Sequence, residues 1–153
     1  MKLLVGLGNP GSKYLQTRHN VGFLFIDYLV KNKLLNKQFR TLKPDTFMNN
    51  SGLAVSKELN FYKLLPADLI VVHDDLDLRL GEFKMQLGKG PHLHNGVESV
   101  EKSVGTKEFW RVRVGVDNRD LENRVSGQSY VLQNFTTEEL DMLHKQVFPK
   151  IKL

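Results

Sequence analysis

Histidine, aspartate and asparagine side chains recur just beyond apolar stretches of this chain. Asn9 and Asp74 come shortly after two apolar runs, and the pair His19-Asn20 ends the loop that follows the first run. Asn49 stands before a second helical stretch, and the pair His94-Asn95 stands at the start of a third. Strand ends and helix starts converge on one rim of an open α/β sheet. We therefore expect these seven side chains to lie close together.

This set of side chains suits hydrolysis by a water molecule that attacks directly. A histidine such as His19 is a good general base near neutral pH, and Asp74 can orient the imidazole or its water. Asparagine amides can donate hydrogen bonds to a developing oxyanion. Ser12 and Ser51 lack the context of a serine nucleophile, and the chain has no cysteine. The residues therefore predict water as the nucleophile.

Two other uses of these residues stay open at this point. Taken one at a time, each has an ordinary structural role, because asparagine caps helices and aspartate makes turns after strands. A metal site is the second alternative, with ligands drawn from His19, His73, Asp74, His92 and His94. No HExxH or similar helical spacing supports a metal site, so we expect no metal.

The opening glycines, in the stretch GLGNPG at residues 6–11, match the spacing of a dinucleotide-binding loop. In such a loop the helix begins inside the motif, so that its N-terminus faces the pyrophosphate. Here Pro10 holds the preceding residue away from helical geometry, and the first helical pattern begins only near Asn20. Asp27, the nearest acidic residue at the required distance, falls inside that helix. We predict a tight turn and no dinucleotide.

Apolar periodicity predicts the elements that must position these residues. Buried or alternating runs predict strands at residues 2–6, 69–72, 83–87 and 110–116. Helical spacing predicts four helices. The first is capped by Asn20 and the second by Ser51. The third spans residues 97–104 and is closed by Gly105, and the fourth follows the capping box at Thr136. Strands that alternate with helices predict a single α/β domain over residues 1–153, with a mixed, mostly parallel sheet sandwiched by helices.

The bulk composition is that of an ordinary globular domain with a basic surface. The 153 residues carry a formal charge of +5, and the isoelectric point is about 9.4. Such a surface attracts polyanions, although these basic residues are spread along the chain. No leader and no apolar run of membrane-spanning length is visible. We expect a cytoplasmic monomer, because no dimerisation stripe stands out.

Four stretches of the sequence resemble the bacterial-type peptidyl-tRNA hydrolase family. They are GLGNPGSKYLQTRHNVGF, KPDTFMNNSGLAV, LIVVHDDLDLRLGEFKMQ and HNGVESVEKSVGTKEFWRVRVGV, and the resemblance runs in order from Lys2 to about Val147. The combination of GLGNPG, TRHN, TFMN and HDDLDL is highly specific. The resemblance implies a single α/β domain that cleaves the ester between a peptide and the 3′ end of tRNA. It further implies recycling of tRNA from aborted translation, with no metal or cofactor.

The resemblance also assigns roles to individual residues. His19 matches the base that activates water, and Asp74 matches its supporting carboxylate. Asn9 and Asn49 match amides that place the carbonyl and the water, and Asn95 matches a further amide of the cleft. Three residues match cleft walls, namely Tyr14, Phe47 and Met48, and one basic residue matches a contact to the tRNA phosphate, namely Arg113.

Some positions depart from the family pattern. The family carries an additional pair of strands between the positions of Arg40 and Thr41. Gln86 stands where the family has a lysine that clamps the tRNA 5′ phosphate, and Lys84 or Lys89 could replace it. The loop at residues 88–94 is bulkier than usual, and VDNR at residues 116–119 replaces a glycine-Arg-Pro turn. These changes leave open a catalytically silent RNA-binding homologue. A weaker alternative is an esterase or amidase of small substrates, for which the basic charge would be incidental.

Overall fold

A five-stranded sheet forms the centre of the protein, whose computed structural model describes residues 1–122 and 124–153. The strands lie in the order β2-β1-β3-β5-β4, and only the edge strand β4 is antiparallel to its neighbour. Their bounds are Lys2–Gly6 for β1, Phe39–Leu42 for β2, Leu69–Arg79 for β3, Phe83–Leu87 for β4 and Trp110–Asp117 for β5. The predicted mixed, mostly parallel sheet is confirmed.

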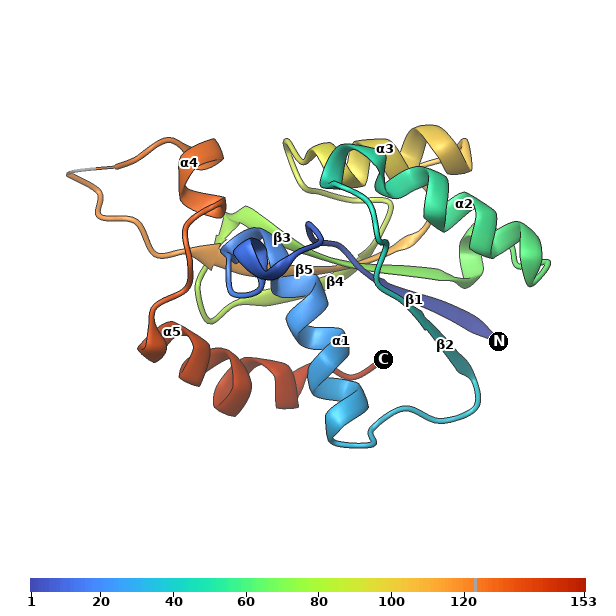
Figure 1. Ribbon diagram of the computed structural model, residues 1–153, viewed down its shortest axis with the longest axis horizontal. Coiled ribbons are helices and arrows are strands. Elements are labelled where there is room, and N and C mark those ends of the chain that lie inside the picture. The colour runs from blue at the N-terminus through green and yellow to red at the C-terminus, as the bar shows by residue number, and fades with distance from the viewer. Residues whose placement is uncertain (123) are drawn as a thin grey trace.

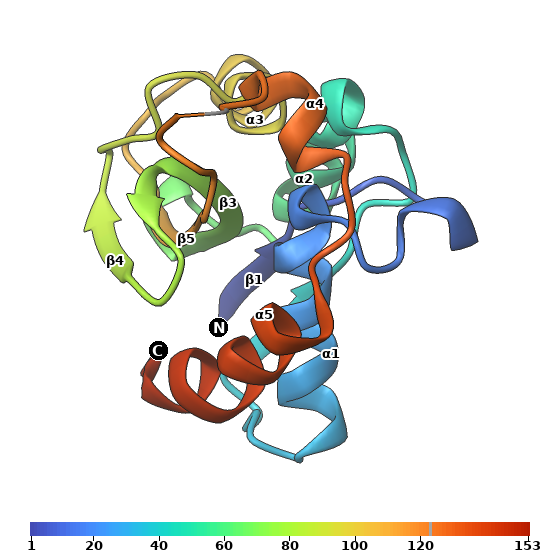
Figure 2. The ribbon, with the colours of Figure 1, turned by 90° about the vertical axis from the view of Figure 1, so that its left-hand side faces the viewer.

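Helices cover both faces of this sheet (Figure 1). Helices α1 (Val21–Lys31) and α5 (Thr137–Met142) lie on one face, while α2 (Ser51–Phe61) and α3 (Asn95–Val104) lie on the other. Figure 2 shows the same layers from the side, and both views place the short helix α4 (Gly127–Val131) at one rim of the sheet. The α/β sandwich predicted from the alternating elements is therefore correct.

The central strand β3 shows why the sheet needs helices on both faces. Successive side chains of a strand point to opposite faces. Ile70 and Val72 accordingly enter the core under α1, whereas Leu69 and Val71 enter the core under α2 and α3. All four are buried, and each such side chain contributes about 1.5–3 kcal/mol by leaving water. The strand continues to Arg79, so that the polar segment after the apolar run still belongs to the sheet.

The opening glycines allow α1 to pack very close to the sheet. A Cβ atom on Gly6 would lie 2.3 Å from the carbonyl oxygen of Gly22, and one on Gly22 would lie 2.4 Å from the carbonyl oxygen of Val72. Gly11 has a φ of 102°, a value that favours glycine. Helix α1 begins only at Val21, well beyond the motif. The glycines therefore serve a turn and a helix–sheet contact.

Several local details differ from the sequence-based expectation. Asn20 precedes α1 as predicted, but its side chain makes no capping bond, because it binds the backbone of Asn9 instead. Helix α2 begins at Ser51 itself, after Asn50, so that Ser51 is not the cap. Strand β2 and helix α4 were not expected from the sequence. Strand β2 crosses Arg40 and Thr41 without interruption and pairs with β1.

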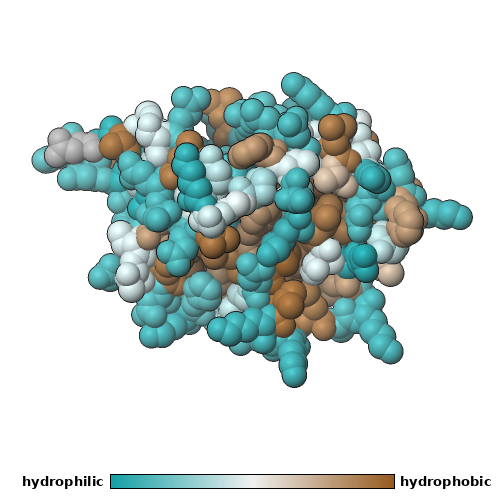
Figure 3. Space-filling model, viewed as in Figure 1, coloured by the Kyte–Doolittle hydropathy of each residue, from teal (hydrophilic) through white to brown (hydrophobic). Residues whose placement is uncertain are grey.

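None of the helices within the described residues has the length and apolar character that a membrane crossing requires. The face seen in Figure 3 is mostly hydrophilic around its periphery, with hydrophobic residues gathered nearer its centre.

Candidate active site

A groove opens at the rim of the sheet where β1 ends beside β3. Its volume is about 530 Å³. We call it the catalytic groove, and it is lined by Asn9, Tyr14, His19, Phe47, Met48, Asn49, Asn95, Gln128, Val131 and Leu132. Seven of these ten residues are site residues predicted from the sequence. The last three come from α4 and the residue after it, and they were not predicted because α4 has no periodic pattern.

His19 lies in the groove with Asp74 directly behind it. The His19 Nδ1 atom is 2.8 Å from Oδ2 and 3.0 Å from Oδ1 of the Asp74 carboxylate. A carboxylate only accepts hydrogen bonds, so Nδ1 carries the proton and Nε2 keeps its lone pair. The His19 side chain is 14% exposed, whereas that of Asp74 is 3% exposed. The arrangement is that of a general base whose tautomer is fixed by a buried carboxylate.

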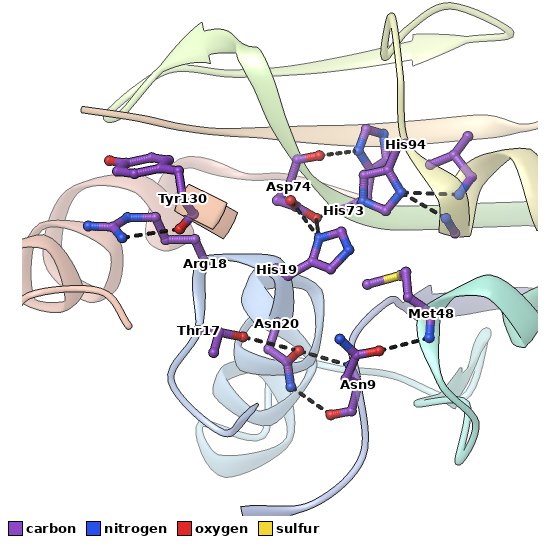
Figure 4. A network of polar contacts seen from close by, with 12 residues as sticks. Asn9, Thr17, Arg18, His19, Asn20, Met48, His73, Asp74, His94 and Tyr130 are labelled. Carbon is purple, nitrogen blue, oxygen red and sulfur yellow. Dashed lines mark hydrogen bonds and ion pairs between the residues drawn. The ribbon is translucent and has the colours of Figure 1, made fainter. Parts of the chain in front are cut away.

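A second histidine, His94, binds the same carboxylate (Figure 4). Its Nε2 atom is 2.7 Å from Asp74 Oδ1. Its Nδ1 atom accepts hydrogen bonds from the backbone N–H groups of Gly96 and Val97, and thereby caps α3. His94 is thus anchored by a helix and holds Asp74 beside His19, with the centroids of the two imidazole rings 4.9 Å apart. His94 was expected at this rim, at the start of the third helix, and as a candidate metal ligand, but its contact with Asp74 was not predicted.

The charges of this cluster depend on one another. Burial alone would raise the pKa of Asp74, but the two histidines that donate to it outweigh burial and hold that pKa well below its usual range. Burial also lowers the pKa of His19, but the Asp74 carboxylate more than offsets this and leaves the His19 pKa above its ordinary value of 6.5. Asp74 is therefore ionised at neutral pH and stabilises the imidazolium that forms when His19 accepts a proton.

The three residues His19, Asp74 and His94 lie close enough to suggest a metal site. Their protons argue against one. His94 Nδ1 already accepts two backbone N–H groups, so its Nε2 must carry the proton that it donates to Asp74. A protonated nitrogen cannot bind a metal ion. His73 also donates, from Nδ1 to the Asp74 carbonyl oxygen at 2.8 Å, and burial lowers its pKa to about 3.

Asn9 is held rigidly at the edge of the groove. Its backbone N–H donates to Asn20 Oδ1 at 2.8 Å, and its carbonyl oxygen accepts from Asn20 Nδ2 at 2.9 Å. Its side-chain Oδ1 accepts from the backbone N–H of Met48 at 2.8 Å. The oxygen is thereby used, and the amino group points toward the side on which His19 lies (Figure 4). Asn9 therefore presents a hydrogen-bond donor, and Asn20 is a positioning residue, a role that the sequence did not predict for it.

Arg18 connects the turn that carries His19 to the wall formed by α4. Its guanidinium lies 3.9 Å from the centroid of the Tyr130 ring, and Nη1 donates to the Tyr130 carbonyl oxygen. Its Nη2 atom is 2.8 Å from Glu139 Oε1, and both side chains are buried. The backbone N–H of Arg18 donates to the carbonyl oxygen of Gln133 at 3.1 Å. The turn that carries His19 and the groove wall are therefore joined by these contacts.

Arg113 lies outside the catalytic groove. Its Nε donates to the buried Asp75 at 2.7 Å, and its Nη1 donates to Gln86 at 2.7 Å. Its side chain is 12% exposed. Lys84 lies directly opposite Arg113 on the neighbouring strand β4, and cross-strand partners share one face of a sheet. The structure thus separates Arg113 from the residues that surround His19.

The protein-family model described as peptidyl-tRNA hydrolase matches residues 3–152 of this chain. The chain belongs to the peptidyl-tRNA hydrolase family. One similar family member is the peptidyl-tRNA hydrolase of Desulfitobacterium hafniense, which is 39% identical over 99% of this chain and 90% of that protein. Another is that of Citrifermentans bemidjiense, which is 43% identical over 93% of this chain and 83% of that protein.

Solved structures of the family share the fold described above. A crystal structure of peptidyl-tRNA hydrolase from Acinetobacter baumannii has a TM-score of 0.80 and 32% sequence identity. The similarity covers 94% of this chain and 81% of that chain. The family and the fold that the sequence motifs predicted are therefore confirmed.

Proposed function

We propose that this protein hydrolyses the ester bond between peptide and tRNA in peptidyl-tRNA, and so recycles tRNA from aborted translation. The observation that carries the proposal is the His19–Asp74 pair at the floor of a groove rimmed by asparagine amides. The relatives described above are peptidyl-tRNA hydrolases, which supports this function over a catalytically silent RNA-binding role. We further propose that the enzyme acts as a monomer in the cytoplasm, because one chain supplies every residue of the groove.

The proposed reaction uses water as the nucleophile. His19 Nε2 accepts a proton from a bound water, and the resulting hydroxide attacks the ester carbonyl carbon. Amide groups of Asn9 and Asn49, with Asn95 beside them, donate hydrogen bonds to the carbonyl oxygen as it gains charge. The tetrahedral intermediate then expels the 3′ oxygen of the tRNA, which takes the proton from His19. The products are a peptide with a free carboxylate and a tRNA with a free 3′ hydroxyl.

The same amides explain how a peptidyl ester is distinguished from an aminoacyl ester. A neutral peptide amide can both donate to and accept from an asparagine side chain, such as Asn49 or Asn95. A free α-ammonium only donates, and it leaves the amide N–H groups without acceptors. The rings of Tyr14 and Phe47 pack edge to face, with their centroids 6.2 Å apart, and they provide an apolar wall for the peptide side chains. Met48 lies beside them in the groove.

A release assay tests this function. We expect the protein to cleave N-acetyl-aminoacyl-tRNA at least about 10²-fold faster than the same tRNA with an unblocked amino acid, because polar mismatch in a binding site is strongly selective. The released amino acid and the free 3′ end are measured by chromatography. Tight binding without cleavage would instead support the RNA-binding alternative. Equal cleavage of both substrates would support a general esterase.

We also propose that Arg113 and Lys84 contact a phosphate near the end of the tRNA. The charge of Arg113 is largely balanced by Asp75, whereas Lys84 is exposed and lies beside it. Gln86 binds Arg113 Nη1 and leaves Nη2 outside these bonds. Lys84 therefore supplies the positive charge that Gln86 lacks.

A further inference from the structure

A second basic cluster surrounds Asp117 at the end of β5. The Asp117 side chain is 3% exposed, and three arginines converge on its carboxylate. Arg119 Nε lies at 2.8 Å, Arg124 Nη2 at 2.6 Å and Arg79 Nη1 at 3.7 Å. We call these four residues the Asp117 cluster. This is the segment where the sequence departs from the glycine-Arg-Pro turn of the family.

The Asp117 cluster carries excess positive charge. Burial alone would raise the pKa of Asp117, but its hydrogen bonds from Arg119 and Arg124 lower that pKa, so the carboxylate is ionised. One carboxylate against three guanidinium groups leaves a net charge of +2. Among the ion pairs of residues 1–122 and 124–153, none joins these arginines to the two acidic residues of the adjacent loop, Asp120 and Glu122.

The three arginines divide into one structural and two exposed members. Arg119 is 11% exposed, also donates to the carbonyl oxygen of Val125, and lies over the Tyr130 ring at 5.4 Å. Arg79 and Arg124 are 51% and 48% exposed, and each approaches Asp117 with a single nitrogen atom. Their remaining N–H groups stay outside these contacts. An arginine held in place with donors to spare is well suited to bind a phosphate.

The position of the Asp117 cluster connects it to the catalytic groove. Tyr130 belongs to α4, and its ring contacts both Arg119 and Arg18, the neighbour of His19. On β5, Asp117 follows Arg113 by four residues and therefore points to the same face of the sheet, about 13 Å farther along the strand. The Asp117 cluster and the pair of Arg113 and Lys84 therefore lie on the same face of the sheet.

We propose that Arg79 and Arg124, held by Asp117, bind a phosphodiester group of the tRNA part of the substrate, at a site separate from Arg113 and Lys84. This inference rests on the proposed function, since it names a second contact to the same substrate. Arg119 holds the loop before α4 against the sheet by binding both Asp117 and the carbonyl oxygen of Val125. The exposed guanidinium groups of Arg79 and Arg124 face the RNA backbone. The contact contributes to binding of the tRNA and takes no part in the reaction of the ester.

The test is a double variant, Arg79→Gln with Arg124→Gln, assayed on two substrates. One is N-acetyl-aminoacyl-tRNA, and the other is the same acyl group on a CCA trinucleotide, which lacks the rest of the tRNA. We expect the KM for the tRNA substrate to rise about tenfold, with kcat and the cleavage of the trinucleotide unchanged. The slope of log(kcat/KM) against log salt concentration should weaken by about 1 to 2, as expected for lost phosphate contacts.

Arg40→Gln is the matched control. Arg40 is 52% exposed and lies 3.6 Å from Glu58, so it resembles Arg79 in exposure and pairing, but it stands on the edge strand β2, which is separated from β3 by β1. We expect its KM and salt slope to match those of the wild type. Arg119 remains paired with Asp117 in the double variant and should preserve the fold, which is checked by the thermal unfolding temperature.

Two results would overturn the inference. An unchanged KM and salt slope for the tRNA substrate would show that these arginines make no contact with RNA. An equal loss on both substrates would show that the cluster only supports the fold of α4. Failure of the proposed function is distinguishable from both results, because the wild-type protein would then cleave neither substrate.

Discussion

Replacing His19 with alanine is expected to lower kcat for cleavage of N-acetyl-aminoacyl-tRNA by about 10²–10⁴-fold, the usual contribution of a positioned general base. The side chain lines the catalytic groove, and Asp74 fixes its Nδ1 proton, so no other histidine is placed to take over the task. His94 is the nearest candidate, but both of its ring nitrogens are already used. The measurement is release of the acylated amino acid at saturating substrate.

His144→Ala is the control for this variant. His144 is exposed, lies next to Tyr28 on the far face of α1, and binds the carbonyl oxygen of Leu140. It should retain wild-type kcat. The KM of the His19→Ala variant should change little, because the imidazole acts on water rather than on the tRNA. Near-complete activity of that variant would contradict the role of His19.

Replacing Asp74 with asparagine is expected to lower kcat by about 10²–10⁴-fold as well, comparable to the loss of the carboxylate in serine-protease triads. The asparagine has nearly the same shape, but it has no charge to stabilise the imidazolium. The amino group of the asparagine would also face the N–H group of either His19 or His94, because both histidines donate a hydrogen bond to the Asp74 carboxylate. Two donors then face each other, and one of these hydrogen bonds is lost. The His19 tautomer is then no longer fixed. The loss is measured as kcat for the same blocked substrate.

The pH dependence of the Asp74→Asn variant separates this catalytic role from a structural one. The carboxylate is what raises the pKa of His19, so its removal should move the acidic limb of the remaining activity to lower pH. Asp75→Asn removes the neighbouring buried carboxylate, which binds Arg113 and no histidine, and should leave the limb in place. An acidic limb that stays at the wild-type position in Asp74→Asn would argue against coupling between Asp74 and His19.

The sequence predicted most of the fold because apolar pattern dominates the central elements. The run at residues 69–72 is buried on both faces, and the glycine at residue 105 closes α3 with a left-handed φ of 85°. Strand β2 escaped prediction because it is an edge strand whose residues are half-buried or exposed and show no alternation. Helix α4 escaped because five residues are too few to show a helical period.

The site was partly predictable for a geometric reason. Asn9 and His19 follow β1, and Asp74 comes after the apolar part of β3. The carboxyl ends of such neighbouring parallel strands meet at one rim of the sheet. The sequence could not show that Asn20 fixes Asn9, or that His94 holds Asp74, because these depend on individual hydrogen-bond directions. The Asp117 cluster was hidden for a related reason, since β3 and β5 bring Arg79 next to residue 117 only in the folded sheet.

The most direct test of the central claim is kcat/KM of the wild-type protein for N-acetyl-aminoacyl-tRNA between about pH 5 and pH 9, after subtraction of uncatalysed ester hydrolysis. A general base must be unprotonated, so activity should be low at acidic pH. It should then rise through one ionisation with a pKa above 6.5 and level off, because Asp74 raises the pKa of His19. A profile that is flat or falling across this range, or a limb that persists unchanged in His19→Ala, would contradict the account.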